Sequence, residues 1–406
     1  MTTERLTISH VGHRGDGIAG GRFVPFTLAG EVVEVEGGDE RALPSAILTA
    51  SPERIQPECR YFGTCGGCAL QHWAPPSYLA WKRDLVATTL RQHGLSAEIA
   101  DTIDAHGAGR RRVTFHARRG QGRDLVVGFA AARSHAIVAI DACPILDPRL
   151  DRALPAARAI ARTLESVAKP LDIQVTATDS GLDVELRGAG KLSERQRLDL
   201  LAAGNAQGLA RLTNHGDLVM QREPPSIHVG AIRVQLPPGA FLQATTAGEE
   251  ILSRLVLDGV GKAKKAADLF CGVGPFALRL AAQTRVHAVD ADALAVAALA
   301  SAVRGASGLK PITTETRDLF RRPMMAADLK GLDAVVFDPP RAGAETQAKI
   351  LAKADIGRIV AVCCNPGTFA RDAATLIAGG WKLQSVTPVD QFRWSAHVEL
   401  VATFSR

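Results

Sequence analysis

Short apolar runs alternate with glycine-containing breaks over the first part of the chain. The runs LTISHVG, RFVPFTLAG and EVVEVEGG have the length and the β-branched content of strands, and GDGIAGG between the first two has the composition of a turn. Several short strands joined by tight turns favour a small closed sheet. We therefore expect a small β-barrel over residues 1–56.

The next stretch mixes strand-like and helix-like patterns. VTFHARR, DLVVGFA and IQVTATDSGLDVEL are rich in β-branched residues, whereas PAARAIARTLESVA has the apolar spacing of an amphipathic helix. This mixture predicts a central α+β domain over residues 57–235.

From residue 236 onward, helical segments alternate with continuous apolar runs. GEEILSRLVLDG and LAVAALASAVRG indicate helices, and KAADLF, RVHAVDA, LDAVVFDPP and RIVAVCC indicate strands. Apolar strands that alternate with helices are typical of a parallel sheet covered on both faces. We expect a Rossmann-like α/β domain over residues 236–406. Three domains suit a chain of 406 residues, since one domain takes roughly 150 residues.

Composition narrows the class of protein. With 46% hydrophobic and 22% charged residues, the chain is not of a disordered or collagen-like type. It lacks the roughly 18 to 20 uninterrupted apolar residues of a membrane span, and MTTERLTISH does not resemble a signal peptide. We expect a cytoplasmic monomer without a membrane partner. Seven cysteines, an odd number, argue against a disulfide framework and favour metal-binding or catalytic thiols.

Positive charge is concentrated in one segment. The net charge of +6 is modest, but residues 110–133 contain seven arginines against one aspartate. Such a patch favours a polyanion partner, although a solvated charged face is the alternative. The arginines are Arg110, Arg111, Arg112, Arg118, Arg119, Arg123 and Arg133.

Four cysteines have the spacing of a cluster site. Cys59, Cys65 and Cys68 form C-x5-C-x2-C, and Cys143 follows at a distance in DACPIL. The two glycines before Cys68 let a short loop turn two sulfurs toward one centre. Four thiolates suit an iron–sulfur cluster, with zinc or unmetallated structural cysteines as alternatives. We expect an iron–sulfur cluster with a structural or RNA-positioning role.

A glycine turn in DLFCGVGPF follows an apolar strand. Gly272 and Gly274 allow a sharp turn and a close approach of the backbone to a ligand, and Asp290 ends the next apolar run, where a carboxylate can bind ribose hydroxyls. A dinucleotide is the alternative ligand. The rigid FDPPRAG segment places Asp338 at the carboxyl edge of the sheet. A hydride-transfer enzyme has no evident need for this element, so we favour S-adenosylmethionine.

The last two motifs carry a thiol and a carboxyl. RIVAVCCNPG ends a strand with Cys363 and Cys364, of which one can face a ligand and the other the core. A thiolate beside the following helix start becomes a nucleophile more easily, whereas a buried structural cysteine is the alternative. Glu399 lies in the apolar strand HVELV, where burial raises the proton affinity of a carboxyl; exposure on an edge strand is the alternative.

The joint order of these motifs resembles the bacterial RNA uracil-C5 methyltransferase family, specifically its iron–sulfur branch acting on 23S ribosomal RNA. The likeness covers almost the whole chain. It implies a TRAM-type RNA-binding barrel over residues 1–56 and a [4Fe-4S] cluster on the four spaced cysteines. It also implies methylation of carbon 5 of a uridine, with transfer RNA as the alternative substrate.

The same resemblance implies roles for single residues. Cys364 matches the nucleophile that adds to carbon 6 of uracil, and Glu399 matches the base that removes the carbon 5 proton. Positions that contact S-adenosylmethionine match Gln243, Phe270, Asp290, Asp318 and Asp338. The chain departs from the family pattern in having Pro275 after the glycine turn, Asp290 instead of Glu, and Cys363 instead of a small residue.

Two rival functions follow from the same motifs. An adenine or cytosine amino methyltransferase would also use a D-P-P turn, but Arg341 stands where such an enzyme needs an aromatic residue, and that chemistry needs no thiol. A non-catalytic RNA-binding protein would have no use for Cys364 and Glu399 together.

Overall fold

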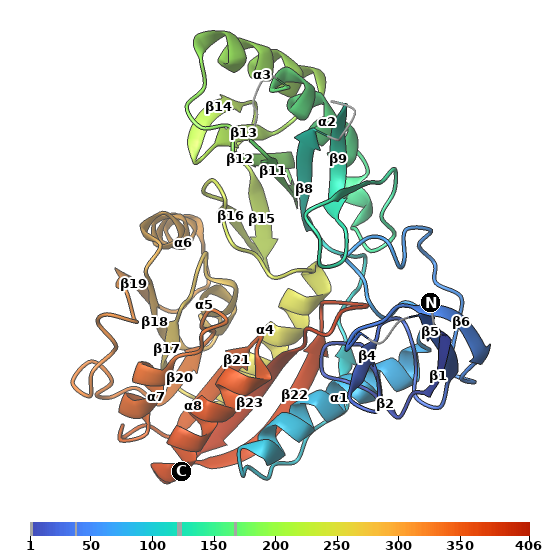
Figure 1. The fold of residues 1–406 in the computed structure, drawn as a ribbon. Helices are drawn as coiled ribbons and strands as arrows, with labels where there is room; N and C mark the ends of the chain where they lie inside the picture. Colours follow the sequence, from blue (N-terminus) through green and yellow to red (C-terminus); the bar gives the residue numbers. More distant parts are fainter. Residues whose placement is uncertain (1–2, 37–38, 120–123, 166–168) are drawn as a thin grey trace.

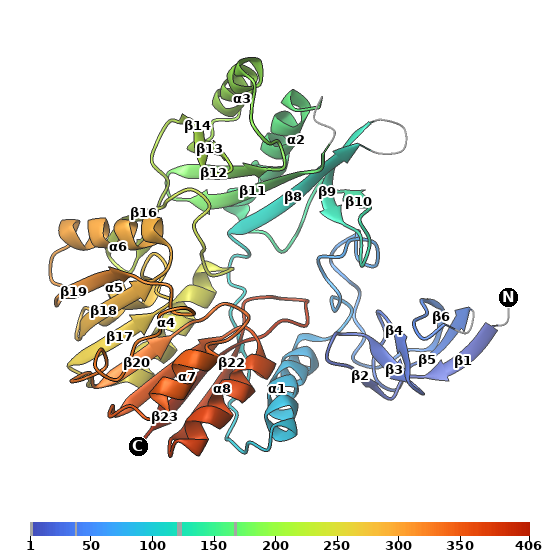
Figure 2. The same ribbon diagram turned by 60° about the vertical axis from the view of Figure 1, so that its left-hand side comes forward.

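The chain folds into three parts that lie side by side. A computed structural model describes residues 3–36, 39–119, 124–165 and 169–406. A small strand-rich part at the N-terminus and a central sheet domain both lie against a larger C-terminal α/β domain (Figures 1 and 2). Among the described residues, no helix has both the length and the apolar character that a membrane crossing requires.

The N-terminal part consists of two three-stranded sheets, β1-β5-β6 and β2-β3-β4. Alternate residues of β5, such as Val33 and Val35, point into a small apolar core with Ile8 and Val24. A strand-rich N-terminal part agrees with the sequence prediction, and its TRAM-type assignment stays a prediction. The strands are β1 Thr3–Thr7, β2 His10–Val11, β3 Gly17–Ala19, β4 Arg22–Val24, β5 Val32–Glu36 and β6 Pro44–Thr49.

The central domain is a seven-stranded sheet in the order β10-β9-β8-β11-β12-β13-β14. Helices α2 and α3 pack on one of its faces (Figure 2). The run IQVTATDSGLDVEL forms two antiparallel strands, because the chain turns between Thr178 and Gly181. The elements are β8 Arg112–Arg119, β9 Leu125–Ala130, β10 Ile137–Ala139, η1 Pro148–Leu150, α2 Ala153–Thr163, β11 Leu171–Thr178, β12 Gly181–Arg187, α3 Glu194–Ala206, β13 Arg211–Asn214 and β14 Asp217–Gln221.

The C-terminal domain has an eight-stranded sheet in the order β19-β18-β17-β20-β21-β23-β22-β7. Strands β17 to β21 run parallel, and β23 joins β21 in the antiparallel direction. This confirms the Rossmann-like domain. Its elements are α4 Thr246–Val260, β17 Lys265–Leu269, α5 Pro275–Leu280, β18 Arg285–Asp290, α6 Ala293–Gly305, β19 Ile312–Thr316, β20 Ala334–Phe337, α7 Glu345–Leu351, β21 Arg358–Cys363, α8 Pro366–Ala378, β22 Lys382–Asp390 and β23 Glu399–Ser405.

Three segments that the sequence places in the central domain pack on the C-terminal one. Helix α1 (Pro75–Gln92) lies beside α8, and the short strand β7 (Ile103–Asp104) pairs with β22 at the edge of the large sheet. The hairpin of β15 (Ser226–Val229) and β16 (Ile232–Gln235) buries its apolar residues against α5 and α6. The exact domain bounds stay a prediction, and these contacts join the two domains through shared packing.

The two faces of the large sheet have separate apolar cores. One core contains residues of α1, α7 and α8, and the other contains residues of α4, α5 and α6. The carboxyl ends of β17, β18, β20 and β21 meet at one edge between these layers, where ligands bind in open α/β sheets. The central domain reaches this edge through Arg111, whose Nε donates to the backbone oxygen of Gln243 at 3.0 Å.

Candidate active site

Two adjacent cysteines at the end of β21 have different surroundings. Cys363 is buried in the apolar core beside Phe369 of α8, and its Sγ donates to the backbone oxygen of Asn365 at 3.3 Å. Cys364 is partly exposed. Cys364 is the first residue after β21 and, unlike Cys363, does not belong to that apolar core. The helix begins here because Asn365 caps it and Pro366 occupies its first turn.

Glu399, the first residue of β23, lies close to Cys364, the first residue after β21. The register of β21 and β23 ends with Cys363 opposite Leu400, and Cys364 and Glu399 are the residues directly beyond this pair. The carboxyl of Glu399 is close enough to raise the pKa of the Cys364 thiol. Strand β23 is an inner strand between β21 and β22, and Glu399 is only 3% exposed. Burial raises the pKa of Glu399, and the nearby Asp338 carboxyl raises it further. This confirms that Glu399 is buried rather than exposed on an edge strand.

The thiol of Cys364 is held in its protonated form. Burial raises its pKa to about 11, and the carboxyls of Glu399 and Asp338 add to the effect. The sequence led us to expect a thiol whose ionisation is favoured by the helix start. In the structure, burial and the two carboxyls outweigh that influence, since two negative groups oppose a third.

Asp338 follows β20 and lies near the same thiol. Burial raises the pKa of this carboxyl, and Nε2 of Gln243 donates to its Oδ2 at 3.0 Å, which acts in the opposite direction. Gln243 comes from the segment between β16 and α4, so the bond joins two distant parts of the chain. The structure thus brings four of the residues singled out from the sequence, Gln243, Asp338, Cys364 and Glu399, into one group.

The glycine turn after β17 forms a second group. Phe270 has a left-handed backbone with φ of 64°, and the backbone N–H of Gly272 donates to Oδ2 of Asp290 at 2.8 Å. A Cβ at Gly272 would meet no atom within 4 Å, whereas a Cβ at Gly274 would lie 2.4 Å from a methyl of Leu299. Gly274 therefore permits close packing of the turn against α6, and Gly272 borders open space at the edge of the sheet.

Asp318 lies beyond this turn, after β19. Its Oδ1 accepts the backbone N–H groups of Phe320 and Arg321 at 3.0 and 3.2 Å and so fixes a local turn. The ring of Phe320 is half exposed and lies 5.6 Å from the ring of Phe270. The contact between these two rings places the local turn at Asp318 next to the glycine turn after β17.

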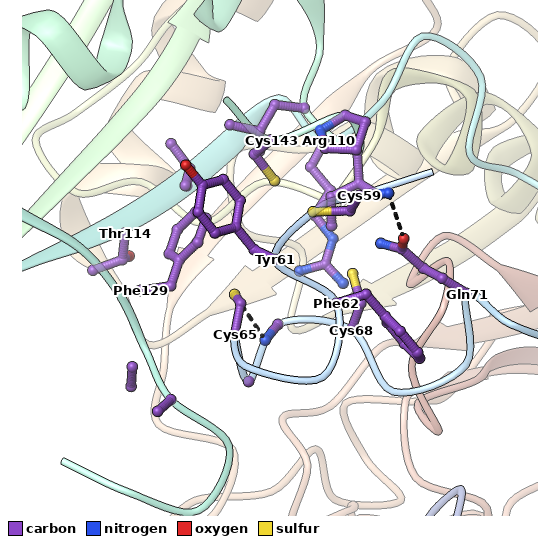
Figure 3. A pocket seen from close by; sticks show the side chains of 18 of the residues that line it. Cys59, Tyr61, Phe62, Cys65, Cys68, Gln71, Arg110, Thr114, Phe129 and Cys143 are labelled. Carbon is purple, nitrogen blue, oxygen red and sulfur yellow. Dashed lines mark hydrogen bonds between the residues drawn. The ribbon is translucent and has the colours of Figure 1, made fainter. Parts of the chain in front are cut away.

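The four spaced cysteines line one cavity. Figure 3 shows their sulfurs pointing into the same space, three from the loop after β6 and that of Cys143 from the segment after β10. The cavity measures about 440 Å³. Burial raises the pKa of Cys68 to about 11 and that of Cys143 to about 12. Across the described residues, no group of three or more His, Cys, Asp or Glu side chains that could hold a metal ion is found.

Arg110 and Gln71 complete the wall of this cavity. The guanidinium of Arg110 points toward Cys68 in Figure 3, and Oε1 of Gln71 accepts the backbone N–H of Cys59 at 3.1 Å. The guanidinium also lies 5.9 Å from the ring of Phe392, in the segment between β22 and Glu399. Arg110 thus joins the wall of the cysteine cavity to the segment that leads to Glu399.

The arginine patch divides into buried and exposed members. Arg111 is 3% exposed and forms an ion pair with Glu249 at 2.6 Å, so its assignment to an RNA-binding patch is wrong. Its charge is needed to neutralise a buried carboxylate. Arg118 and Arg119 are exposed, and Arg112 stacks 5.1 Å from the ring of Phe241.

The remaining arginines of the patch differ again. Arg133 pairs with Asp16 of the N-terminal part at 3.1 Å. Arg110 faces the cysteine cavity, as described above. Arg123 lies outside the described residues.

Comparison with known proteins identifies the family. The family model described as tRNA (Uracil-5-)-methyltransferase matches residues 191–406, which is more than half of the chain. The chain belongs to this family. It is an RNA (uracil-5-)-methyltransferase, and the multidomain architecture with a C-terminal methyltransferase domain is confirmed. The amino methyltransferase and the non-catalytic RNA-binding protein are thereby excluded.

Relatives match this methyltransferase over its full length. An uncharacterized RNA methyltransferase of Brucella suis biovar 1 is 47% identical and covers 100% of this chain and 98% of its own. The 23S rRNA (uracil(1939)-C(5))-methyltransferase RlmD of Pseudomonas savastanoi pv. phaseolicola is 33% identical over 99% of this chain and 93% of its own.

A solved structure has the same fold. The tRNA (uracil-54, C5)-methyltransferase of Pyrococcus abyssi, in complex with S-adenosyl-L-homocysteine, matches with a TM-score of 0.75 at 24% identity. The match covers 98% of this chain and 99% of that one. At this identity the likeness concerns the fold alone.

The sequence motifs missed two buried polar residues of the methyltransferase. Gln391 has no exposed surface and donates to Oε2 of Glu399 at 3.0 Å. Asp268, on β17, is fully buried. Burial raises the pKa of Asp268 well above its usual range, and the backbone N–H of Ala277 acts in the opposite direction. A polar residue inside the apolar run KAADLF is the signal that marks Asp268, whereas Gln391 follows a strand and carries no distinguishing pattern.

Proposed function

We propose that this methyltransferase modifies carbon 5 of a uridine in 23S ribosomal RNA by covalent catalysis, with Cys364 as nucleophile and Glu399 as base. The observation that carries the proposal is the proximity of these two residues, which lie directly beyond the paired residues Cys363 and Leu400, with the Asp338 carboxyl close enough to raise the pKa of both. A thiol next to a buried carboxyl provides both groups that the reaction needs.

The first step creates a nucleophile on the substrate. The thiol of Cys364 loses its proton to solvent, Sγ bonds to carbon 6 of uracil, and the electrons of the carbon 5–carbon 6 double bond move toward the carbonyl at carbon 4, which gives an enolate. Carbon 5 then takes the methyl group from the sulfonium sulfur of the methyl donor, which would leave as a neutral thioether, and becomes a saturated carbon that bears both methyl and hydrogen. Because the ring must reach Cys364 at the sheet edge, the uridine has to leave any base stack.

The second step restores the ring. Glu399 removes the proton from carbon 5, the double bond to carbon 6 re-forms, and the bond between carbon 6 and Sγ breaks. Burial and Asp338 raise the pKa of Glu399, which increases the affinity of its carboxylate for that proton. A carboxyl of ordinary acidity would be a weaker base.

S-adenosylmethionine fits the glycine turn as the methyl donor. Family membership supports this cofactor, which supplies an electrophilic methyl group when bound. Gly272 leaves open space at the carboxyl edge of the sheet, and Asp290 bonds the turn itself through one carboxylate oxygen. We assign the cofactor to Gln243, Phe270, Gly272, Gly274, Asp290, Asp318 and Asp338.

We further propose that the cysteine cavity holds a [4Fe-4S] cluster. Four thiols from two distant segments line a common space of about 440 Å³. Four thiolates can hold either a cluster or zinc, and the family resemblance favours the cluster. Cys59, Cys65, Cys68 and Cys143 would hold the cluster, which would join the loop after β6 to the segment after β10.

Ribosomal RNA is the favoured substrate because the 33% identical Pseudomonas relative carries that name over nearly the whole chain. RNA from a strain that lacks the gene should lose 5-methyluridine at one position of 23S ribosomal RNA. Loss from transfer RNA alone would overturn the ribosomal assignment and leave the chemistry intact. The cytoplasmic location and the monomeric state stay predictions.

The covalent mechanism is tested with variants of the two active groups. We expect Glu399→Gln to transfer methyl yet release product slowly, so that a protein–RNA complex accumulates on denaturing electrophoresis. Cys364→Ala should form no complex and show no turnover, whereas Cys363→Ala should retain the complex because its thiol faces the core. Methylation without a covalent complex in any variant would refute the mechanism.

A further inference from the structure

Gln391 is a buried amide that the proposed reaction does not yet use. It directly follows β22 and has no exposed surface. Its Oε1 accepts the backbone N–H of Ala244 at 2.8 Å. Because a backbone N–H can only donate, this bond fixes which end of the amide is oxygen. The opposite end, Nε2, therefore faces Gln243 and Glu399.

The fixed amide begins a directed chain of hydrogen bonds. Nε2 of Gln391 donates to Oε2 of Glu399 at 3.0 Å and to Oε1 of Gln243 at 2.7 Å. Since Oε1 of Gln243 accepts, its Nε2 is free to donate to Oδ2 of Asp338 at 3.0 Å. Two amides thus connect two buried carboxyls and direct one N–H donor at each of them.

We propose that Gln391 is a positioning residue for Glu399, which holds the carboxylate in place and favours its ionised form before the proton is removed from carbon 5. The inference rests on the proposed function. A donated hydrogen bond stabilises a carboxylate more than a protonated carboxyl, and it leaves Oε1 of Glu399 free to take the proton.

The other groups around Glu399 act in the opposite sense. Asp338 disfavours a negative charge on it, as burial does, whereas the thiols of Cys363 and Cys364 have raised pKa values and are mostly protonated, and so uncharged, at neutral pH. Asp390, the residue before Gln391, is already bound to Lys82. The bond from Gln391 is the one side-chain hydrogen bond to Glu399 within the described part of the chain, so the ionised base depends on it.

Release of tritium from carbon 5 reports the step that Glu399 performs, and division by the rate of adduct formation measured at the same pH removes the pH dependence of the Cys364 addition. The substrate is a 23S ribosomal RNA transcript made with uridine tritiated at carbon 5, used in single turnover from pH 5.5 to 9. Because a base acts only when ionised, release by the unmodified enzyme should rise with pH. For Gln391→Met the midpoint should move up by about one pH unit, which is about tenfold slower release on the rising limb.

Gln391→Glu should move the midpoint further than Gln391→Met. It keeps an oxygen for the N–H of Ala244, yet it places an acceptor against Glu399. Its size matches that of glutamine, so it provides the measurement even if Gln391→Met does not fold. The matched control is Gln384→Met. Gln384 is an exposed residue of β22 whose amide donates to the hydroxyl of Ser405. Tritium release by this variant should depend on pH as it does in the unmodified enzyme.

The rate at which the covalent complex forms distinguishes a positioning role of Gln391 from a general structural role. Both Gln391 variants should form the complex with RNA that contains 5-fluorouridine at a rate within about twofold of the unmodified enzyme, because that step needs no base. An unchanged pH midpoint in both variants, or an equal loss of complex formation and tritium release at every pH, would overturn the inference. Absence of the complex in the unmodified enzyme would instead refute the proposed covalent mechanism.

Discussion

The backbone oxygen of Trp394 accepts the backbone N–H of Ala69 at 2.8 Å. Ala69 directly follows Cys68 in the cysteine loop, and Trp394 lies in the segment that leads from β22 to Glu399. The indole Nε1 of Trp394 also donates to Oε1 of Glu58 at 3.1 Å, on the other side of the same loop. The loop that carries three cysteines therefore supports the segment that carries the base.

Loss of the cysteine site should lower both metal content and catalysis. Anaerobically purified protein should contain about four iron and four sulfide per chain, and Cys143→Ser should lose them. Because the cysteine loop supports Trp394, we expect methylation by this variant to fall at least about tenfold. Iron and sulfide assays with single-turnover methylation provide the measurement. Stoichiometric zinc without sulfide, or full activity after loss of iron, would contradict this prediction.

The rate of adduct formation should increase with pH. The pKa of Cys364 is raised to about 11, so the thiol is mostly protonated at neutral pH. Below that pKa the thiolate fraction grows about tenfold per pH unit, and the thiolate is the nucleophile. Rapid-quench measurement with 5-fluorouridine RNA from pH 7 to 9 should show this increase, both in the unmodified enzyme and in Cys363→Ala. A rate that does not vary over this range would show that bound RNA or cofactor lowers the pKa of the thiol.

Exposed arginines on β8 should carry part of the RNA affinity. Arg118 and Arg119 lie at the exposed end of the strand, where their side chains donate to backbone oxygens. Replacing both with glutamine should reduce the slope of log affinity against log salt by about one unit for each lost phosphate contact. Filter binding at several salt concentrations gives the slope. Arg195→Gln, at an exposed position on α3, serves as control. An equal change of the slope in this variant would show that the arginines of β8 contribute no more to RNA binding than other exposed arginines.

The buried pair of Lys82 and Asp390 should contribute strongly to stability. Nζ of Lys82 lies 2.5 Å from Oδ1 of Asp390, both side chains are almost fully buried, and Nζ also donates to the backbone oxygen of His397 at 2.6 Å. Lys82→Met leaves a buried carboxylate without its cation, so the free energy of unfolding should fall by about 3 to 5 kcal/mol. Urea denaturation measures the change.

A matched surface variant separates this effect from general loss of charge. Lys349 forms an exposed ion pair with Glu345 on α7. Lys349→Met should change the free energy of unfolding by less than about 1 kcal/mol, since exposed pairs contribute little. Equal effects of the two variants would show that Asp390 is stabilised by other groups, such as the hydroxyl of Tyr78, which donates to it at 2.8 Å.

Local patterns in the sequence predicted the Rossmann-like domain and the sheet edge at which Cys364 and Asp338 lie. Apolar runs that end in a reactive or acidic residue, such as RIVAVCC and LDAVVFDPP, place Cys364 and Asp338 at the same sheet edge by the topology of parallel strands alone. The polar Glu399 inside an apolar strand left burial and exposure on an edge strand as alternatives, and the inner position of β23 decided for burial. The predictions of the domain and of the sheet edge held because each depends on strand periodicity, which is a local property of the chain.

Tertiary structure decided which arginines of the basic segment are buried in ion pairs and which lie on the surface. Arg111 and Arg118 are seven residues apart on one basic segment, yet one is buried against Glu249 and the other is exposed, because the start of β8 enters the domain contact and its end leaves it. Gln391 and Trp394 likewise obtain their partners, Ala244 and Ala69, from segments that are far away in the sequence. No local pattern specifies such contacts, since they depend on how three separately folded parts pack together.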